Sequence, residues 1–142
     1  MSDLRKLAIE YAKAFIGRPY IWGGDDPIKG FDCSGLILEV LQAVGIVPHG
    51  YDTTANGLYR RFSENFSPPG PGMLVFWLNL AGRATHVEMM IDESHTIGAS
   101  GGGQATRTAE DAASQNAFIK IRPLEYRGSH YVILDPFKDI EQ

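Results

Sequence analysis

In Gly30-Phe31-Asp32-Cys33-Ser34-Gly35-Leu36-Ile37 a glycine-rich segment gives way to a predicted apolar helix, and the rest of the predicted fold is arranged around this junction. The single cysteine of the chain, Cys33, stands at the predicted start of that helix. The first turn of a helix has unpaired amide N–H groups and about half a positive charge, which favours a thiolate over a thiol. This placement indicates a cysteine that acts as a nucleophile.

A packing role is the alternative for Cys33. A lone cysteine is commonly a small buried hydrophobic residue. The neighbours of Cys33 favour the nucleophile, because Ser34 and Gly35 are small enough to let a substrate approach. A cysteine used only for packing is expected inside the apolar stripe, with Leu36 and Val40.

A histidine, the usual partner of a catalytic cysteine, lies downstream in Thr85-His86-Val87-Glu88-Met89-Met90-Ile91. The composition of this stretch predicts a strand. A histidine next to a cysteine can stabilise the thiolate and carry protons during the reaction. Together, Cys33 and His86 indicate thiol-based acyl-transfer chemistry.

The composition fits one globular domain, which we expect to span residues 1–142. Hydrophobic residues make up 44% and charged residues 21%, an ordinary globular balance. A net charge of −4 differs from the excess of basic side chains typical of nucleic-acid binding, so we expect no nucleic-acid partner. One cysteine rules out an intramolecular disulfide, and the four histidines show no zinc-ligand spacing. We therefore expect no metal and no cofactor.

The N-terminal residues, from Met1 to Leu7, contain charged side chains and lead into an amphipathic pattern. A signal peptide needs an uninterrupted apolar stretch of about 7–15 residues, and a membrane span needs about 18 apolar residues. The sequence shows neither, so we expect synthesis in the cytoplasm without a signal peptide or a membrane span. A substrate in the cell wall would then require release or delivery of the protein.

The predicted elements run helices first and strands second. Apolar residues at three- and four-residue spacing predict a helix from Leu4 to Ile16, capped by Asp3, and another from Cys33 to Val44. A short third helix ends at Arg61. Strands are predicted at residues 73–78, 86–91, 95–99, 117–121 and 131–134. This order predicts an α+β fold in which N-terminal helices pack on a small, mostly antiparallel sheet.

Four strings with characteristic spacing occur along the chain. They are Gly17-Arg18-Pro19-Tyr20-Ile21-Trp22-Gly23-Gly24, Phe31-Asp32-Cys33-Ser34-Gly35-Leu36, Pro71-Gly72-Met73-Leu74-Val75-Phe76-Trp77 and Thr85-His86-Val87. In this order they resemble the NlpC-type family of cell-wall cysteine peptidases, whose fold is papain-like. Each string alone is weak, whereas four in order with fitting gaps are specific, and the resemblance runs from about residue 8 to residue 121. It implies that Cys33 attacks a peptide carbonyl and that His86 is the general base.

The resemblance also implies roles for residues around Cys33. Tyr20 matches a family tyrosine whose hydroxyl lies beside the nucleophile, where it could donate to the oxyanion together with the Cys33 backbone N–H. Asp32 and Ser34 match positions that help to hold a free substrate amine, and Asp32 fits a plain helix cap equally well. Trp22 could form a wall of the groove or serve in packing.

The third catalytic position departs from the family pattern. In the family a His, Asn, Gln or Glu on the strand after the histidine strand orients the imidazole through Nδ1, and the matching position here is Gly98. His95 is close in sequence, but the hairpin register places it by the turn, roughly 10 Å from the level of His86. We therefore interpret His95 as a surface residue.

Glu88 is a different candidate for the third position. Residues i and i+2 of a strand point to the same face, so Glu88 projects beside His86. We hypothesise that Glu88 reaches over the space left by Gly98 and hydrogen-bonds His86. In the alternative, Glu88 makes a structural contact, and water or a backbone carbonyl orients His86.

The predicted function is a cysteine peptidase that hydrolyses peptidoglycan stem peptides at a bond next to D-glutamate, through a thioester on Cys33. The peptide-bond class follows from the nucleophile and base, and the cell-wall substrate from the resemblance alone. A phage-encoded enzyme, with the phage particle or lysis components as partners, fits best, and a bacterial effector is the alternative.

Two rival functions stay open. One is an amidase or acyltransferase that acts on a non-wall amide. The other is a catalytically decayed domain with a structural or assembly role, which Gly98 in the third position could signal.

Overall fold

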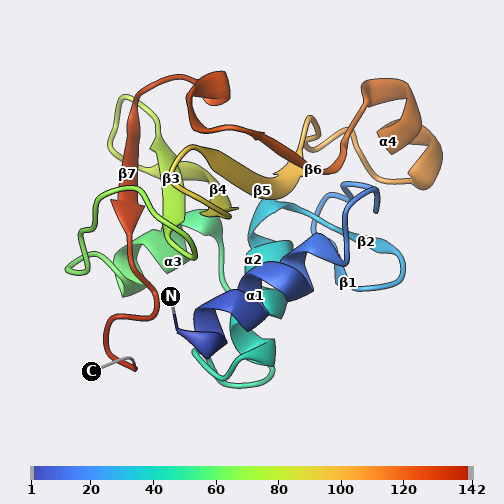
Figure 1. Ribbon diagram of the computed structural model, residues 1–142. Coiled ribbons are helices and arrows are strands. Elements are labelled where there is room, and N and C mark those ends of the chain that lie inside the picture. The colour runs from blue at the N-terminus through green and yellow to red at the C-terminus, as the bar shows by residue number, and fades with distance from the viewer. Residues whose placement is uncertain (1, 141–142) are drawn as a thin grey trace.

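The computed structural model describes residues 2–140, with helices in the first half and a five-stranded sheet in the second (Figure 1). The helices of the first half are α1 (Asp3–Lys13), α2 (Cys33–Ala43) and α3 (Ala55–Arg61). The strands of the sheet are β3 (Leu74–Leu78), β4 (Ala84–Met90), β5 (His95–Ser100), β6 (Phe118–Pro123) and β7 (Tyr131–Leu134). The remaining elements are the small hairpin of β1 (Asp25–Asp26) and β2 (Gly30–Phe31), helix α4 (Ala109–Gln115) and the 3₁₀-helix η1 (Leu124–Arg127).

The five strands pair antiparallel in the order β6-β5-β4-β3-β7. Helices α1, α2 and α3 lie on one face of this sheet, and α2 packs against β4 and β5 (Figure 1). All five predicted strands are present, with ends shifted by at most two residues. The predicted α+β architecture is confirmed.

Helix α2 carries the apolar stripe that builds the core under the sheet. The stripe consists of Leu36, Ile37, Val40 and Leu41, none of which has exposed surface. The same core includes Phe76, Val87, Met89 and Ile97 from the strands. Burying an aliphatic side chain stabilises a fold by about 1.5–3 kcal/mol, so this stripe fixes α2, and Cys33 at its start, against β4.

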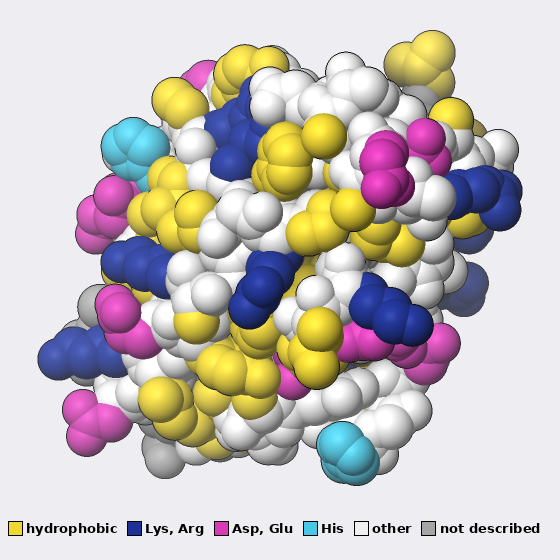
Figure 2. Space-filling model, turned by 90° about the vertical axis from the view of Figure 1, so that its right-hand side faces the viewer, with side chains coloured by type: hydrophobic (Ala, Val, Ile, Leu, Met, Phe, Trp, Pro, Cys, Tyr) yellow, Lys and Arg dark blue, Asp and Glu magenta, His cyan; other side chains and the backbone are white. Residues whose placement is uncertain are grey.

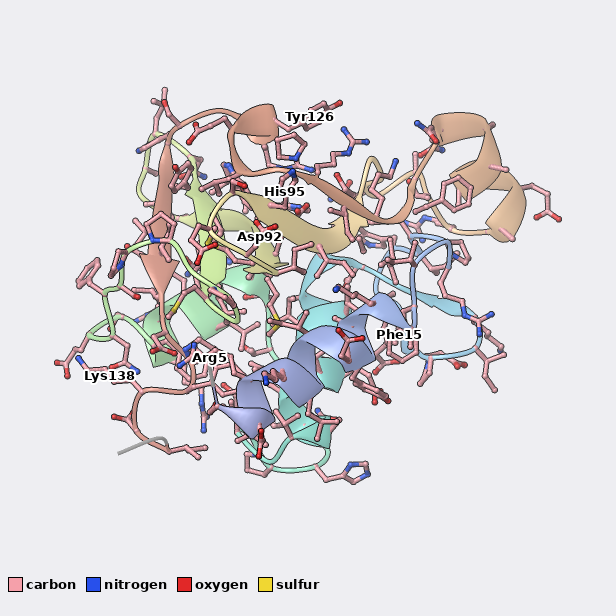
Figure 3. The ribbon with its side chains drawn as sticks, viewed as in Figure 1. Arg5, Phe15, Asp92, His95, Tyr126 and Lys138 are labelled. Carbon is pink, nitrogen blue, oxygen red and sulfur yellow. The ribbon has the colours of Figure 1, made fainter. Side chains whose placement is uncertain are left out.

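The opposite face of the sheet is covered by the segment that follows β6. Val75, Trp77 and Met90 of the strands form a second apolar cluster with Leu124 of η1. Figure 3 shows Tyr126 of η1 above β5, on the side away from α1 and α2. Side chains of β4 therefore alternate between two covered faces of the sheet.

The glycine-rich segment before α2 packs closely on the first turn of the helix. The backbone N–H of Asp32 donates to the carbonyl of Gly24 over 3.0 Å. A Cβ at Gly35 would lie only 2.1 Å from that carbonyl oxygen. Because only glycine allows this approach, Gly35 keeps the segment and the helix start together.

Helix α1 differs from its prediction at both ends. Its N-cap is Ser2 rather than Asp3, because Ser2 has an extended backbone and its hydroxyl accepts the N–H of Arg5. Asp3 instead lies in the first turn, where its carboxylate interacts favourably with the helix dipole. The α-helix ends at Lys13, and a turn follows.

The sequence prediction misses the hairpin β1–β2, helix α4 and η1. Helix α4 has seven residues, of which Ala112 alone is buried, so it shows little apolar periodicity. Its detectable signal is a capping box, in which the Thr108 hydroxyl accepts the Asp111 N–H and the Asp111 carboxylate accepts the Thr108 N–H.

Basic side chains are dispersed on the face drawn in Figure 2. Lys and Arg side chains there are separated by acidic, apolar and uncharged ones. This distribution agrees with the net charge of −4 and differs from the basic stripe typical of nucleic-acid binding. Within residues 2–140, every helix is too short or too polar to cross a bilayer.

Arg5 joins α1 to the chain that follows β7. Its guanidinium donates to the two carboxylate oxygens of Asp135 over 3.2 and 3.3 Å, and to the Pro71 carbonyl over 3.2 Å. The Arg5 and Asp135 side chains are only 10% and 15% exposed. Asp135 also accepts the Phe137 backbone N–H over 2.8 Å. This ion pair ties the first helix to the end of the fold.

Removing the Asp135 carboxylate takes away the charge that neutralises a buried arginine. We expect Asp135→Ala to lower the free energy of unfolding by about 2–3 kcal/mol, as measured by urea denaturation. Glu10→Ala is the control, because it breaks an exposed 3.5 Å pair with Lys13 and should change stability by less than about 0.5 kcal/mol. Equal losses in the two variants would contradict the structural importance of the Arg5–Asp135 pair.

Candidate active site

Cys33 is the first residue of α2, and Asp32 caps the helix in front of it. The Asp32 Oδ1 accepts the Gly35 N–H over 2.8 Å and the Ser34 hydroxyl over 3.4 Å. Burial raises the pKa of Asp32 above its ordinary value, despite the opposing hydrogen bonds from Gly35, Gly23 and Ser34. Asp32 therefore has the capping role that the sequence allowed, and it fixes the helix end that carries Cys33.

An open cavity of about 300 Å³ lies beside Cys33. Its wall includes Cys33 together with Tyr20, Trp22, Asp32 and Ser34. Arg83, Ala84 and Thr85, which directly precede His86, also line it. The fold thus brings all the residues predicted for the substrate side of the site to one cavity, whose size is in the range of ligand-binding clefts.

Tyr20 reaches the cavity from the segment before β1. Its backbone N–H donates to the Ala117 carbonyl over 2.9 Å, and it forms a bridge with Phe31. Burial raises the pKa of the Tyr20 hydroxyl, and the negative charges of Cys33 and Asp32 raise it further. Tyr20 therefore stays protonated at neutral pH and can donate a hydrogen bond to a negatively charged oxygen.

His86 lies on β4 and pairs with Trp77 of β3. The two rings are 5.5 Å apart at an interplanar angle of 49°. Burial alone lowers the pKa of His86, but hydrogen bonds with Cys33 and Glu88 outweigh burial and raise the pKa above its ordinary value. The fold therefore brings His86 into interaction with the Cys33 thiol and favours its protonated form.

Glu88 lies on the other side of the His86 ring. Its Oε2 is 2.7 Å from His86 Nε2, and its Oε1 accepts the Thr96 hydroxyl over 2.6 Å. Burial raises the pKa of Glu88, yet the hydrogen bond and charge of His86, the Thr96 hydroxyl and the charge of Arg127 together lower it. Glu88 is thus an ionised carboxylate with a side chain only 4% exposed.

The glycine at position 98 leaves the space that Glu88 fills. A Cβ at Gly98 would lie 2.3 Å from Cγ and 2.6 Å from Cδ of Glu88. Pairing of Met89 with Ile97 sets this register between β4 and β5. The predicted hydrogen bond between His86 and Glu88 is present, and the Glu88 side chain fills the space at Gly98.

Glu88 contacts the imidazole at Nε2, whereas the resemblance implied Nδ1 for the third residue of the family. Nδ1 is then the ring nitrogen left to face Cys33.

His95 is the first residue of β5, directly after the turn that joins β4 to β5. Its Nδ1 is 3.2 Å from Asp92 Oδ1 and 3.0 Å from the Ser94 hydroxyl, and its side chain is 44% exposed. Figure 3 shows His95 and Asp92 near each other at this turn. Its position agrees with the interpretation of His95 as a surface residue.

Sequence reasoning missed Thr96 and Arg127, which both interact with Glu88. Thr96 is 1% exposed and lies two residues before Gly98, on the same face of β5. A polar residue at a strand position predicted to be buried is the sequence feature that could have identified it. No sequence feature could have identified Arg127, because it lies in η1. The path of η1 across the sheet depends on the tertiary fold.

The residues of this site are suited to nucleophilic catalysis by a cysteine. Among the residues described, no three His, Cys, Asp or Glu side chains converge as a metal site would require. Cys33, His86 and Glu88 instead have the arrangement of a nucleophile, a base and the group that orients the base.

Comparison with known proteins identifies the family. The model of the NlpC/P60 family matches residues 17–123, three quarters of the chain, and the chain belongs to this family. Cys33, His86, Glu88 and Tyr20 all lie inside the matched region.

Three similar proteins indicate how far the relationship extends. Murein DD-endopeptidase MepH of Escherichia coli is 33% identical over 133 residues, which cover 89% of this chain and 44% of MepH. Bifunctional muramidase/DL-endopeptidase CwlT of Bacillus subtilis is 28% identical over 102 residues, which cover 71% of this chain and 31% of CwlT. A crystal structure of an NlpC/P60 family protein from Bacillus cereus has a TM-score of 0.70 at 24% identity, over 92% of this chain and 39% of that chain. The papain-like fold is confirmed, and the chain spans less than half of each of these proteins.

Filling the space at Gly98 should separate Glu88 from His86. Because the Glu88 carboxylate raises the pKa of His86, its displacement by Gly98→Ala should move the His86 titration to lower pH. Glu88→Gln should move it in the same direction. An NMR titration of the His86 ring protons measures the shift.

Gly103→Ala is the matched control for this experiment. No heavy atom lies within 4 Å of a Cβ at Gly103, so this variant should titrate like the wild type. A His86 titration that Gly98→Ala leaves unchanged would show that the glycine is not needed for the Glu88–His86 contact.

Proposed function

We propose that the chain is a cysteine peptidase that hydrolyses peptidoglycan stem peptides. The main support for this proposal is the linked group Cys33, His86 and Glu88, of which Cys33 lines an open cavity. The cell-wall substrate is supported by membership of the NlpC/P60 family and by the names of MepH and CwlT, a murein DD-endopeptidase and a DL-endopeptidase. The Glu88 carboxylate fills the space left by Gly98, which favours a catalytically active site over a catalytically decayed one.

The first half of the reaction forms a thioester. The Cys33 sulfur attacks the scissile carbonyl carbon, and negative charge develops on the carbonyl oxygen. The Tyr20 hydroxyl and the Cys33 backbone N–H donate hydrogen bonds to that oxygen. As the C–N bond breaks, protonated His86 gives its proton to the leaving amine. The products are an acyl thioester on Cys33, a free amine and a neutral imidazole.

The second half of the reaction releases the acid. Neutral His86 takes a proton from a water molecule while the water oxygen attacks the thioester carbonyl. The C–S bond breaks, the peptide leaves as a carboxylic acid, and the thiolate and protonated His86 are restored. Glu88 fixes the orientation of the ring and stabilises its positive charge, and it does not accept the proton.

Asp32, Ser34 and Trp22 form the substrate side of the proposal. The hydrogen bonds from Gly35 and Ser34 both end at Oδ1 of Asp32, and Gly23 supplies a further backbone hydrogen bond to this carboxylate. In the proposal a substrate amine is an additional donor to the same carboxylate. Trp22, 43% exposed, offers an apolar surface to the peptide. These contacts would favour a stem peptide whose amino end is free.

The bond proposed for cleavage is the one next to D-glutamate. The DL-endopeptidase activity in the name of CwlT supports this choice, and the DD-endopeptidase name of MepH supplies the alternative bond. As part of the same proposal, the enzyme reaches the wall by release at lysis or by carriage in a phage particle. Tests of wall digestion and of delivery can address these two parts separately.

Digestion of purified peptidoglycan, followed by mass spectrometry of the fragments, tests the proposed activity. The wild-type protein should shorten stem peptides at D-glutamate, and Cys33→Ala should release no fragments. Glu88→Ala should keep its circular dichroism spectrum and lower turnover more than about tenfold, because the base loses its orientation and its charge partner.

The other outcomes of the digest point to the rival functions. Separated but unshortened stems would assign the cross-link as the cleaved bond. Turnover of a simple amide without release of wall fragments would indicate an amidase or acyltransferase. A folded protein inactive in both assays would indicate a structural or assembly role. Full turnover by Glu88→Ala would remove Glu88 from the catalytic group.

A further inference from the structure

Glu88 is a buried carboxylate whose closest charged partner, His86, changes its charge during the proposed reaction. Once His86 has given its proton to the leaving amine, Glu88 lies beside a neutral ring. A buried carboxylate without a cation takes up a proton readily, because burial disfavours the charged form. A second, permanent cation near Glu88 would keep the carboxylate ionised and leave proton transfer to His86 and the substrate.

Arg127 of η1 provides such a cation. Its Nη2 lies 3.9 Å from Oε2 of Glu88, the same oxygen that faces His86. The Arg127 side chain is 33% exposed, whereas that of Glu88 is 4% exposed. An arginine stays protonated throughout the pH range of an enzyme, so its charge does not change when His86 loses its proton.

Contacts with two strands hold Arg127 in this place. Its guanidinium donates to the hydroxyl of Ser100 at the end of β5 over 2.5 Å. Its Cζ lies 5.7 Å from the centre of the Trp77 ring, which in turn packs against His86. The Trp77 Nε1–H donates to the carbonyl of Gly128, the residue after Arg127. Arg127 is therefore attached to the same cluster of side chains as the catalytic histidine.

The other charged groups near Glu88 have different principal partners. Arg122 of β6 lies with its Cζ 3.9 Å from the centre of the Tyr126 ring. Lys120 of β6 donates to the Asn116 carbonyl over 2.7 Å, and its pKa is lowered by burial and by Arg122, with only partial compensation from Glu88. The neighbours of Glu88 on β3 and β5, Val75 and Thr96, carry no charge. Arg127 is the cation best placed to balance the carboxylate.

We propose that Arg127 is a positioning residue that keeps Glu88 ionised while His86 loses and regains its proton. This inference rests on the proposed function and extends the site from β4 to η1. The contacts of the Arg127 guanidinium are with Glu88, Ser100 and Trp77, so it acts on His86 through Glu88. Its charge also lowers the pKa of the Tyr20 hydroxyl, but burial keeps that pKa raised overall. Its removal should therefore change how activity depends on pH more than it changes substrate binding.

Three variants test this role in the peptidoglycan-peptide assay. Arg127→Gln removes the charge, Arg127→Lys keeps it, and Arg122→Gln removes a neighbouring charge that has another partner. Loss of a cation makes a carboxylate easier to protonate, so Arg127→Gln should lose activity at higher pH during acidification than the wild type. We expect kcat to fall about tenfold on the acidic side, a change equivalent to one pKa unit, with KM within about twofold.

The control variants give the expected contrast. Arg127→Lys should recover most of the turnover, and Arg122→Gln should stay within about twofold of the wild type at every pH. A uniform loss across pH in Arg127→Gln, or the same pH change in Arg122→Gln, would overturn the inference. Circular dichroism verifies the fold of each variant.

A second measurement separates this inference from the proposed function. A carbon NMR titration of the Glu88 carboxyl group needs no substrate, and Arg127→Gln should shift its midpoint to higher pH while Arg122→Gln does not. An inactive wild type with this shift would refute the peptidase and retain the role of Arg127. If the wild type is active and Arg127→Gln leaves the Glu88 titration unchanged, the peptidase function stands and the proposed role of Arg127 is refuted.

Discussion

The hydrogen bond between His86 and Glu88 is the interaction on which the site depends. It places a negative charge inside the protein at a side chain only 4% exposed, a position where an isolated carboxylate would be unstable. The surrounding residues stabilise this buried negative charge. Thr96 donates to one oxygen, His86 and Arg127 lie at the other, and Gly98 leaves the necessary space. In return the carboxylate raises the pKa of His86, which favours the protonated ring beside Cys33.

The two halves of the chain contribute different parts of this site. The first half supplies the helix start, where the buried stripe of α2 and the close approach at Gly35 fix Cys33 at the edge of a cavity. The second half supplies a rigid sheet, whose β4 carries the base and its carboxylate two residues apart. The active site forms where α2 packs against β4. Apolar packing across this junction therefore also sets the position of the sulfur relative to the imidazole.

Most of the fold and the centre of the site could be predicted from local patterns in the sequence. Three- and four-residue spacing identified α1 and α2, and the period of two on a strand placed Glu88 beside His86. Features that depend on the tertiary structure could not be predicted from the sequence. The two-residue strands of the first hairpin and the polar helix α4 have too little apolar periodicity to detect. Arg127 reaches Glu88 only because η1 crosses the sheet.

Alkylation of Cys33 by iodoacetamide at neutral pH shows whether His86 activates an accessible thiol, and it needs no assumption about the substrate. An accessible thiol activated by His86 should react quickly, and His86→Ala should slow the reaction at least about tenfold in a protein that remains folded. A slow reaction in the wild type, or a rate indifferent to the loss of the imidazole, would contradict the account.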